Sequence, residues 1–203
     1  MILIGQYDSP FVRRVAISLH HFGLAFDREV MSVFGDFDEL TRQNPLGRVP
    51  ALRLDDGEVL VDSQMILDHL ELEAGSDQAL TPPHGAARRA VLKRTTMALG
   101  AAEKAVALRG ELYRRREGSQ DEAVASRMRT QIASALDWLE EQGPDPWYAG
   151  AIAQDDIATA VTVTFLIEKP PHLFDTGRWP RLAALNTAAE ALPAFRAAPF
   201  EPD

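Results

Sequence analysis

The sequence contains no cysteine among its 203 residues. Disulfide bonds and thiolate metal sites are therefore excluded, and any thiol chemistry must use a thiol that a ligand carries. The five histidines do not show metal-ligand spacing either. His20 and His21 are adjacent and face different sides of one predicted helix, and the other three are scattered. We therefore expect no metal site.

Long apolar runs and basic tracts are also missing. No stretch approaches the ~18 apolar residues of a membrane span, and the opening MILI is shorter than the apolar core of a signal peptide. The formal net charge is −9, and the only dense basic cluster, residues 114–116, is typical of the C-terminal end of a helix. We expect a cytoplasmic protein with no membrane or nucleic-acid partner.

The first part of the chain alternates between strand and helix patterns. The predicted strands cover residues 2–6, 26–33, 50–54 and 59–61, and the predicted helices cover 12–22, 36–43 and 63–74. Gly23 is placed to end the first helix, and Asp36 and Glu39 open the second at the spacing of a capping box. The resulting order, βαβαββα, indicates a small α/β domain over residues 1–76.

The second part of the chain has no strand pattern. Residues 77–85 have the composition of a linker, with two consecutive prolines. Helical patterns then cover residues 86–117, 121–142, 155–168 and 179–191. The third of these is almost entirely apolar, which favours a buried central helix. The sequence therefore predicts an α/β domain followed by an all-helical domain at residues 86–203.

The stretch GQYDSPFVRR, residues 5–14, joins the first strand to the first helix. Ser9 is a good N-cap and Pro10 suits the first helical position, so the pair could serve only to start the helix. A hydroxyl at a helix N-terminus also stabilises anions such as a thiolate. Thioredoxin-like proteins carry the first cysteine of C-x-x-C at this place, where this chain has S-P-F-V.

Five stretches occur in the order seen in one known family. They are S-P-F-V-R at 9–13, N-P-L-G-R-V-P at 44–50, D-S at 62–63, D-I at 156–157, and R-W-P-R-L through L-P-A-F at 178–195. On these stretches the chain resembles the glutathione transferase superfamily over nearly its whole length, and within it a bacterial type of transferase-like protein. The resemblance implies a thioredoxin-like domain that binds glutathione and a helical domain that forms a pocket for an electrophile.

The resemblance also implies a role for the segment before the third strand. In the family, the bond equivalent to Val49-Pro50 is cis, so that the valine backbone faces the cysteinyl part of glutathione. The alternative is an ordinary trans proline at the start of a strand. Arg48 could reach the glycyl carboxylate of glutathione, or it could be a solvated loop residue.

Asp62 and Ser63 lie between the hairpin and the third helix. Both residue types cap helices well, so a purely structural role is one interpretation. The resemblance implies another, since glutathione carries an α-carboxylate and an α-ammonium at its γ-glutamyl end. A serine hydroxyl at a helix N-terminus suits the carboxylate, and an aspartate suits the ammonium.

Two hydroxyls compete for the catalytic role. Several transferase classes use a tyrosine near the end of the first strand to stabilise the thiolate, and Tyr7 lies close to that place. The spacing of S-P-F-V-R matches the serine type better, so we expect Ser9 to be the catalytic residue and also to contact glutathione.

Asp156 is expected to open the buried helix. In the family a Ser or Thr three residues earlier completes a capping box, and this chain has Ala153 there. Gln154 or Asp155 could substitute.

The resemblance implies a glutathione transferase that joins the glutathione thiolate to a small, hydrophobic electrophile in detoxification, as a homodimer. Two alternatives stay open. One is a non-catalytic interaction module of the same fold, and the other is a glutathione-dependent disulfide reductase or peroxidase.

Overall fold

The computed structural model describes residues 1–75 and 77–202. Ser76 and Asp203, at which the two predicted domains end, lie outside the described residues. The chain forms two compact units. One comprises Met1–Pro83 together with the segment from Ala191 onward, and the other comprises His84–Glu190. The domain boundaries drawn from the sequence stay a prediction.

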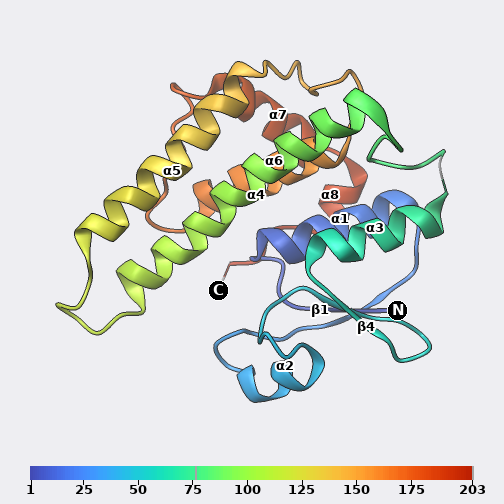
Figure 1. Cartoon of the computed structure of the whole chain (residues 1–203), viewed down its shortest axis with the longest axis horizontal. Helices are drawn as coiled ribbons and strands as arrows, with labels where there is room; N and C mark the ends of the chain where they lie inside the picture. Colours follow the sequence, from blue (N-terminus) through green and yellow to red (C-terminus); the bar gives the residue numbers. More distant parts are fainter. Residues whose placement is uncertain (76, 203) are drawn as a thin grey trace. The chain divides into compact units, whose positions relative to one another are not determined.

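The first unit is a four-stranded sheet with helices. Its elements are β1 (Ile2–Ile4), α1 (Pro10–Phe22), β2 (Asp27–Glu29), α2 (Phe37–Gln43), β3 (Ala51–Arg53), β4 (Val59–Val61), α3 (Ser63–Ala74) and α8 (Pro193–Ala197). The strands lie in the order β2-β1-β3-β4, with β1 parallel to β2 and the other pairs antiparallel. Helices α1 and α3 cover one face, and α2 lies on the other (Figure 1). The predicted βαβαββα order is confirmed.

Local sequence explains both ends of α1. The Ser9 side chain caps the helix, Pro10 occupies its first position, and Gly23 ends it in the left-handed region at φ 67°. Val12, Val15 and Leu19 are completely buried, so the helix is fixed to the sheet by its apolar face.

Helix α2 starts differently from the expectation. The Asp36 side chain makes no capping bond to the helix, and its carboxylate accepts a hydrogen bond from the Ser32 N–H at 2.8 Å. The predicted capping box is therefore wrong, because the carboxylate closes the preceding turn instead.

The end of the chain packs on the first unit, through a helix that the sequence patterns did not predict. Arg13 in α1 is buried and donates from Nε to the Ala198 carbonyl at 2.8 Å, and its guanidinium lies 5.7 Å from the centre of the Phe195 ring. Arg28 makes two 2.9 Å hydrogen bonds to the Glu201 carboxylate. These contacts join the C-terminal segment to α1 and β2.

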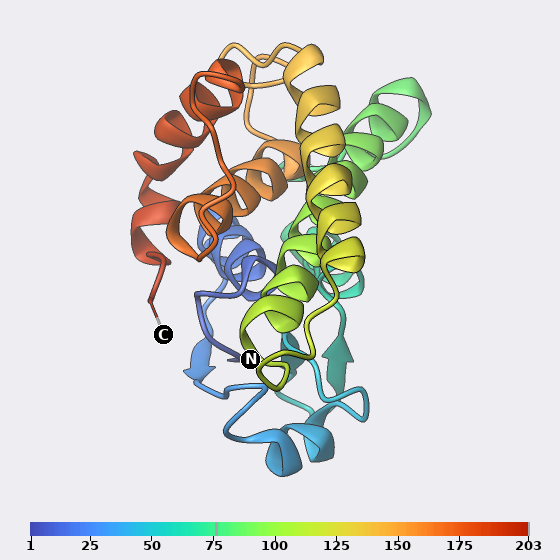
Figure 2. The same ribbon diagram turned by 90° about the vertical axis from the view of Figure 1, so that its left-hand side faces the viewer.

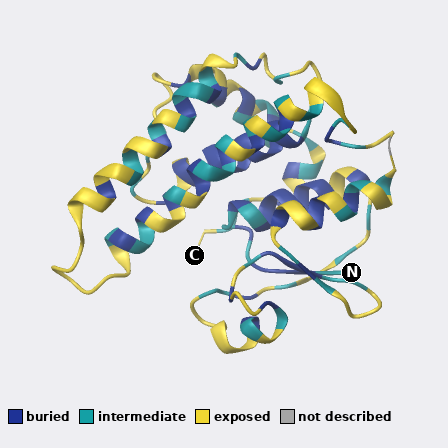
Figure 3. Cartoon of the chain, viewed as in Figure 1, coloured by how far each residue is buried: buried dark blue, intermediate teal, exposed yellow. Residues whose placement is uncertain are grey.

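The second unit contains only helices among its described elements. They are α4 (Gly85–Tyr113), α5 (Glu122–Glu141), α6 (Gln154–Glu168) and α7 (Pro180–Glu190). Helices α4 and α5 pack side by side in opposite directions (Figure 2). Helix α6 is buried from Gln154 to Leu166 (Figure 3), which confirms the predicted central helix.

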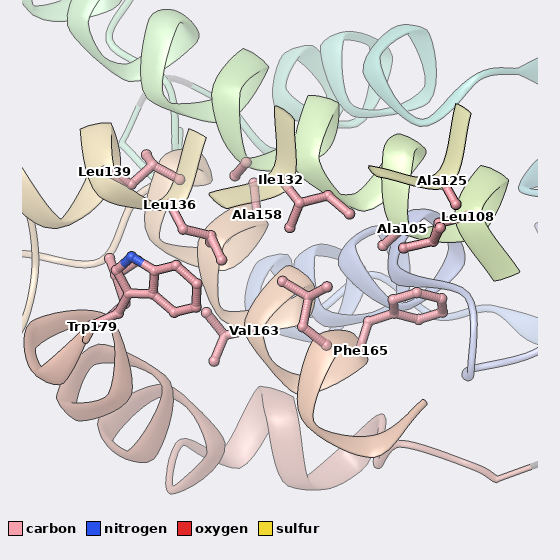
Figure 4. Close-up of a cluster of buried hydrophobic side chains, with 13 residues drawn as sticks. Ala105, Leu108, Ala125, Ile132, Leu136, Leu139, Ala158, Val163, Phe165 and Trp179 are labelled. Carbon is pink, nitrogen blue, oxygen red and sulfur yellow. The ribbon is translucent and has the colours of Figure 1, made fainter. Parts of the chain in front are cut away.

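The core of the second unit forms where α4 packs on α5 and α6, and residues at the start of α7 complete it. Ile132 and Leu136 of α5 face Val163 of α6, with Phe165 and Trp179 close by (Figure 4). The Trp179 indole N–H donates to the Asp137 carboxylate at 2.9 Å, so the buried ring keeps a polar partner. Burying each aliphatic side chain of this core contributes about 1.5–3 kcal/mol.

Asp156 holds the start of α6. Its carboxylate accepts hydrogen bonds from the N–H groups of Ala153 at 2.8 Å and Tyr148 at 3.0 Å. Alanine has no side-chain acceptor, so the capping box is incomplete as expected, and the Asp155 carboxylate accepts from the Asp156 N–H at 3.2 Å instead. Burial and the neighbouring Asp155 raise the pKa of Asp156 to about 7. Asp155 itself pairs with Arg94 at 2.6 Å.

We predict that Asp156→Ala destabilises the protein by about 3 kcal/mol, because two partly buried N–H groups lose their acceptor. The matched control is Asp121→Ala. Asp121 also accepts from two N–H groups at the start of a helix, but it is exposed and water can replace it, so about 1 kcal/mol is expected. Chemical denaturation below the raised pKa of Asp156 measures both, because above it the cost of a buried charge would offset the loss. Equal losses for the two variants would contradict the prediction.

Candidate functional site

Ser9 combines a helix N-terminus with an accessible hydroxyl. The residue is half-buried and extended, at φ −73° and ψ 121°, and its Oγ accepts a hydrogen bond from the Val12 N–H at 3.4 Å. Because the oxygen accepts from the backbone, its own proton is available to a ligand. The free N–H groups of the first turn and the helix dipole favour an anion at the same place.

Gly5 brings this turn next to Val49. A Cβ atom at position 5 would lie 2.6 Å from Val12 Cγ2 and 3.0 Å from Val49 Cβ, and the residue has φ +133°. Only glycine fits both the space and the backbone angle. The end of β1, the start of α1 and the Val49 segment are therefore in direct contact. Sequence reasoning missed Gly5, although it lies within the first predicted strand, directly after the apolar run MILI.

A buried asparagine shapes the loop before β3. Asn44 donates from its side chain to the Arg48 carbonyl at 2.8 Å and accepts from the Leu46 N–H at 3.0 Å. The Val49–Pro50 bond is cis, as the resemblance implied, and Pro50 is buried. The Arg48 side chain is exposed. It takes no part in the approach of Gly5 to Val49 or in the hydrogen bond between Arg14 and Ser63.

Asp62 adopts a backbone conformation that is unusual for a residue with a side chain. Its φ is 67° and its ψ is 131°, and its carboxylate accepts from the Gln64 N–H at 2.8 Å. Such a conformation costs about 1–3 kcal/mol in a non-glycine residue and is concentrated at functional sites. Asp62 is exposed, so this acidic group remains accessible at the start of α3.

Ser63 is the first residue of α3, and only 4% of it is exposed. Its Oγ accepts a hydrogen bond from Nη1 of Arg14 at 3.4 Å, which links the starts of α3 and α1. Arg14 is completely buried. Burial lowers the pKa of Arg14 to about 10, an effect that Asp62 and Glu71 oppose, so the guanidinium stays charged at neutral pH.

Both arginines of S-P-F-V-R-R make contacts inside the first unit. Arg13 contacts the C-terminal segment, and Arg14 contacts Ser63. The sequence did not predict either contact. Two consecutive arginines at the start of a helix are usually solvated, and only the covering of α1 by α3 and α8 buries them.

Tyr7 is packed rather than open. The residue is 2% exposed, and the Arg28 guanidinium lies 3.4 Å from the centre of its ring. Burial raises the pKa of Tyr7, although Arg28 acts in the opposite direction. These contacts give Tyr7 a sufficient structural role and support Ser9 as the accessible hydroxyl of the segment.

Among residues 1–75 and 77–202, no group of three or more His, Cys, Asp or Glu side chains could hold a metal ion. No helix within the same residues has the length and apolar character needed to cross a membrane.

Comparison with known proteins decides the family. Residues 3–78 match the family model "Glutathione S-transferase, N-terminal domain". The GST-like protein YibF of Escherichia coli K12 is 32% identical over 141 residues, which cover 69% of this chain and 68% of YibF. The chain belongs to the glutathione S-transferase superfamily. The resemblance seen in the motifs is therefore confirmed.

Two further members of the glutathione S-transferase superfamily are similar over nearly their whole length. Maleylacetoacetate isomerase of Pseudomonas aeruginosa is 28% identical over 206 residues, covering 98% of this chain and 95% of the isomerase. The crystal structure of a glutathione S-transferase from Methylobacterium radiotolerans, in complex with glutathione sulfonate, is 28% identical. Its TM-score is 0.91, with 100% of this chain and 96% of that chain covered, which confirms the predicted fold class.

Proposed function

We propose that this protein is a cytoplasmic glutathione transferase that joins the glutathione thiolate to small, hydrophobic electrophiles and serves detoxification. Glutathione is the co-substrate, and no metal takes part. One observation carries the proposal: two helix N-termini, each with a serine, are linked through Arg14 in a chain whose structural relative is a complex with glutathione sulfonate.

Each part of glutathione has a chemically suitable partner. The γ-glutamyl carboxylate suits the Ser63 hydroxyl and the N-terminus of α3, and the ammonium suits the exposed carboxylate of Asp62. The cysteinyl backbone pairs with the Val49 backbone beside Pro50. The thiol then lies at Ser9, and the glycyl carboxylate lies on the side of Arg48.

The chemistry required of the protein is ionisation of a thiol. A free thiol has a pKa of about 8.5 and is mostly protonated at neutral pH. Each unit by which the pKa falls needs about 1.4 kcal/mol of thiolate stabilisation. A hydrogen bond from Ser9 and the dipole of α1 together supply about one to two units. The thiol proton leaves to solvent, the sulfur forms a bond to the electrophilic carbon, and a leaving group such as halide departs with the electron pair of the bond that breaks.

Glutathione binding and turnover test the proposal together. Calorimetry with the wild-type protein should show binding, and a chromogenic aryl halide should be conjugated in a glutathione-dependent reaction. A non-catalytic module would give no turnover, and absence of binding would reject the proposal. Reduction of a mixed disulfide that exceeds conjugation would favour the reductase alternative.

Glutathione-dependent isomerisation is the second candidate, because the similar isomerase matches this chain from end to end. A thiolate that adds to a conjugated cis double bond leaves a single bond that can rotate, and expulsion of the thiolate then gives the trans isomer. The same site serves both reactions. Conversion of maleylacetoacetate without consumption of glutathione would identify isomerisation, whereas conjugation consumes one glutathione for each product.

We predict that the protein is a homodimer. A closed pair with twofold symmetry makes each contact twice, so a modest apolar face suffices. Exposed apolar side chains in the first unit, including Leu46, Met65 and Leu72, are available for such a contact. Sedimentation at micromolar concentration should give twice the 22.4 kDa of one chain. A mass that stays at the monomer value would contradict the prediction.

A further inference from the structure

Arg14 is a buried charge at a position that does not require one for helix formation. No part of the residue is exposed, and arginine is among the residues least often completely buried. An apolar side chain of similar length would fill the same space between α1 and α3 without the cost of desolvating a charge. The position of the charge, next to the first residue of α3, therefore suggests a role in what α3 binds.

The contact with Ser63 fixes the direction of a hydrogen bond. A guanidinium group has only donors, so the Ser63 oxygen must accept from Arg14 Nη1. The hydroxyl proton of Ser63 then has to point away from Arg14. A hydroxyl held in this way acts as a donor, and the free N–H groups at the start of α3 are also donors. The whole end of the helix is thereby set to receive an acceptor with negative charge.

The charge of Arg14 adds to this preference. The guanidinium lies within the first unit, away from water, where its attraction for an anion is screened less than at the surface. Asp62 and Glu71 offset part of that charge. Asp62 is exposed, and its carboxylate accepts from the Gln64 N–H. The group next to Arg14 that can donate to a ligand is therefore the Ser63 hydroxyl.

We propose that Arg14 is a positioning residue that holds the Ser63 hydroxyl as a donor to the γ-glutamyl α-carboxylate, and so makes the site selective for γ-glutamyl thiols. Arg14 does not touch the ligand and acts through Ser63. This inference rests on the proposed function, because it assigns a further determinant to the same site.

The test compares two ligands on the same protein. One is glutathione and the other is γ-aminobutyryl-cysteinylglycine, which lacks only the α-carboxylate. Arg14→Met keeps an unbranched apolar stem and removes the donors and the charge, and it should reduce the preference for glutathione by about ten-fold. Arg14→Lys retains charge and donors and should recover part of the preference. The ratio of two affinities is insensitive to any inactive fraction of a variant.

Arg13→Met is the matched control, because Arg13 is the adjacent buried arginine and contacts the C-terminal segment instead. It should leave the ligand preference unchanged. The pKa of the bound thiol, which Ser9 governs, should stay the same in the Arg14 variants, whereas general disruption of the unit would move both quantities. An unchanged preference in Arg14→Met would overturn the inference.

A measurement on the wild-type protein decides the matter even if the Arg14 variants do not fold. The guanidinium N–H signals of Arg14 in NMR spectra should shift on addition of glutathione and stay in place with the analogue that lacks the carboxylate. Equal responses to both ligands would reject the role of Arg14. If neither ligand binds to the wild-type protein, the proposed function itself has failed, which is a different result.

Discussion

Ser9→Ala is expected to raise the pKa of the bound glutathione thiol by about one unit and to lower conjugation near neutral pH by about ten-fold. The Ser9 hydroxyl accepts from the Val12 N–H and has its proton free to donate to the thiolate. Loss of this donor removes stabilisation of the charged form, while the dipole of α1 remains.

The difference in conjugation rate between Ser9→Ala and the wild type should depend on pH. Below the pKa of the variant, the rate should fall in proportion to the thiolate fraction. At high pH the thiol ionises without help, so the difference between variant and wild type should shrink. Glutathione affinity should change much less, because the γ-glutamyl and backbone contacts are made elsewhere in the site.

Tyr7→Phe is the matched control, since it also removes one hydroxyl and leaves the ring in place beneath Arg28. We expect it to leave the thiolate absorbance intact. If Tyr7→Phe abolishes that absorbance while Ser9→Ala preserves it, the tyrosine is the catalytic residue and our assignment is wrong. If neither variant has an effect, the N–H groups of α1 carry the thiolate.

Ser63→Ala is expected to weaken glutathione binding by about 1–3 kcal/mol, because a hydrogen bond to a charged carboxylate is lost. That energy corresponds to roughly 5- to 150-fold in affinity. The loss should be larger for glutathione than for the analogue without the α-carboxylate. Isothermal calorimetry measures both affinities directly.

Ser18→Ala provides the control for Ser63→Ala. Ser18 is another buried serine of the first unit, and its hydroxyl donates to the Arg14 carbonyl at 2.9 Å rather than facing a helix N-terminus. Any loss of affinity from a small change in packing should appear there too. An affinity for glutathione that is the same in Ser63→Ala and in the wild type would remove Ser63 from the binding site.

The order of elements could be predicted because local residues determine where each element starts and ends. Ser9 and Pro10 start α1, Gly23 ends it, and Asp62 caps α3, as their residue types indicated. Asp36 shows the limit of such reasoning. Its spacing to Glu39 matches a capping box, but the nearby Ser32 N–H offers its carboxylate another partner. Pattern alone does not show which of two local donors an aspartate takes.

The residues that hold the site together could not be predicted in the same way. Ser9, Val49 and Ser63 were expected from their motifs, whereas Gly5, Asn44 and Arg14 connect those motifs in space. Their role depends on contacts between segments far apart in the chain, such as Arg14 with Ser63. A helical pattern treats arginine as a solvent-facing residue, and only the packing of α1 against α3 makes it a buried donor.

The most direct test of the central claim is a pH titration of the thiolate absorbance of glutathione bound to the wild-type protein. The site described here, with a serine hydroxyl at the N-terminus of α1, predicts a bound thiol pKa about one to two units below the free value of about 8.5. A bound thiol that titrates at the free value would contradict the claim that this helix end activates glutathione.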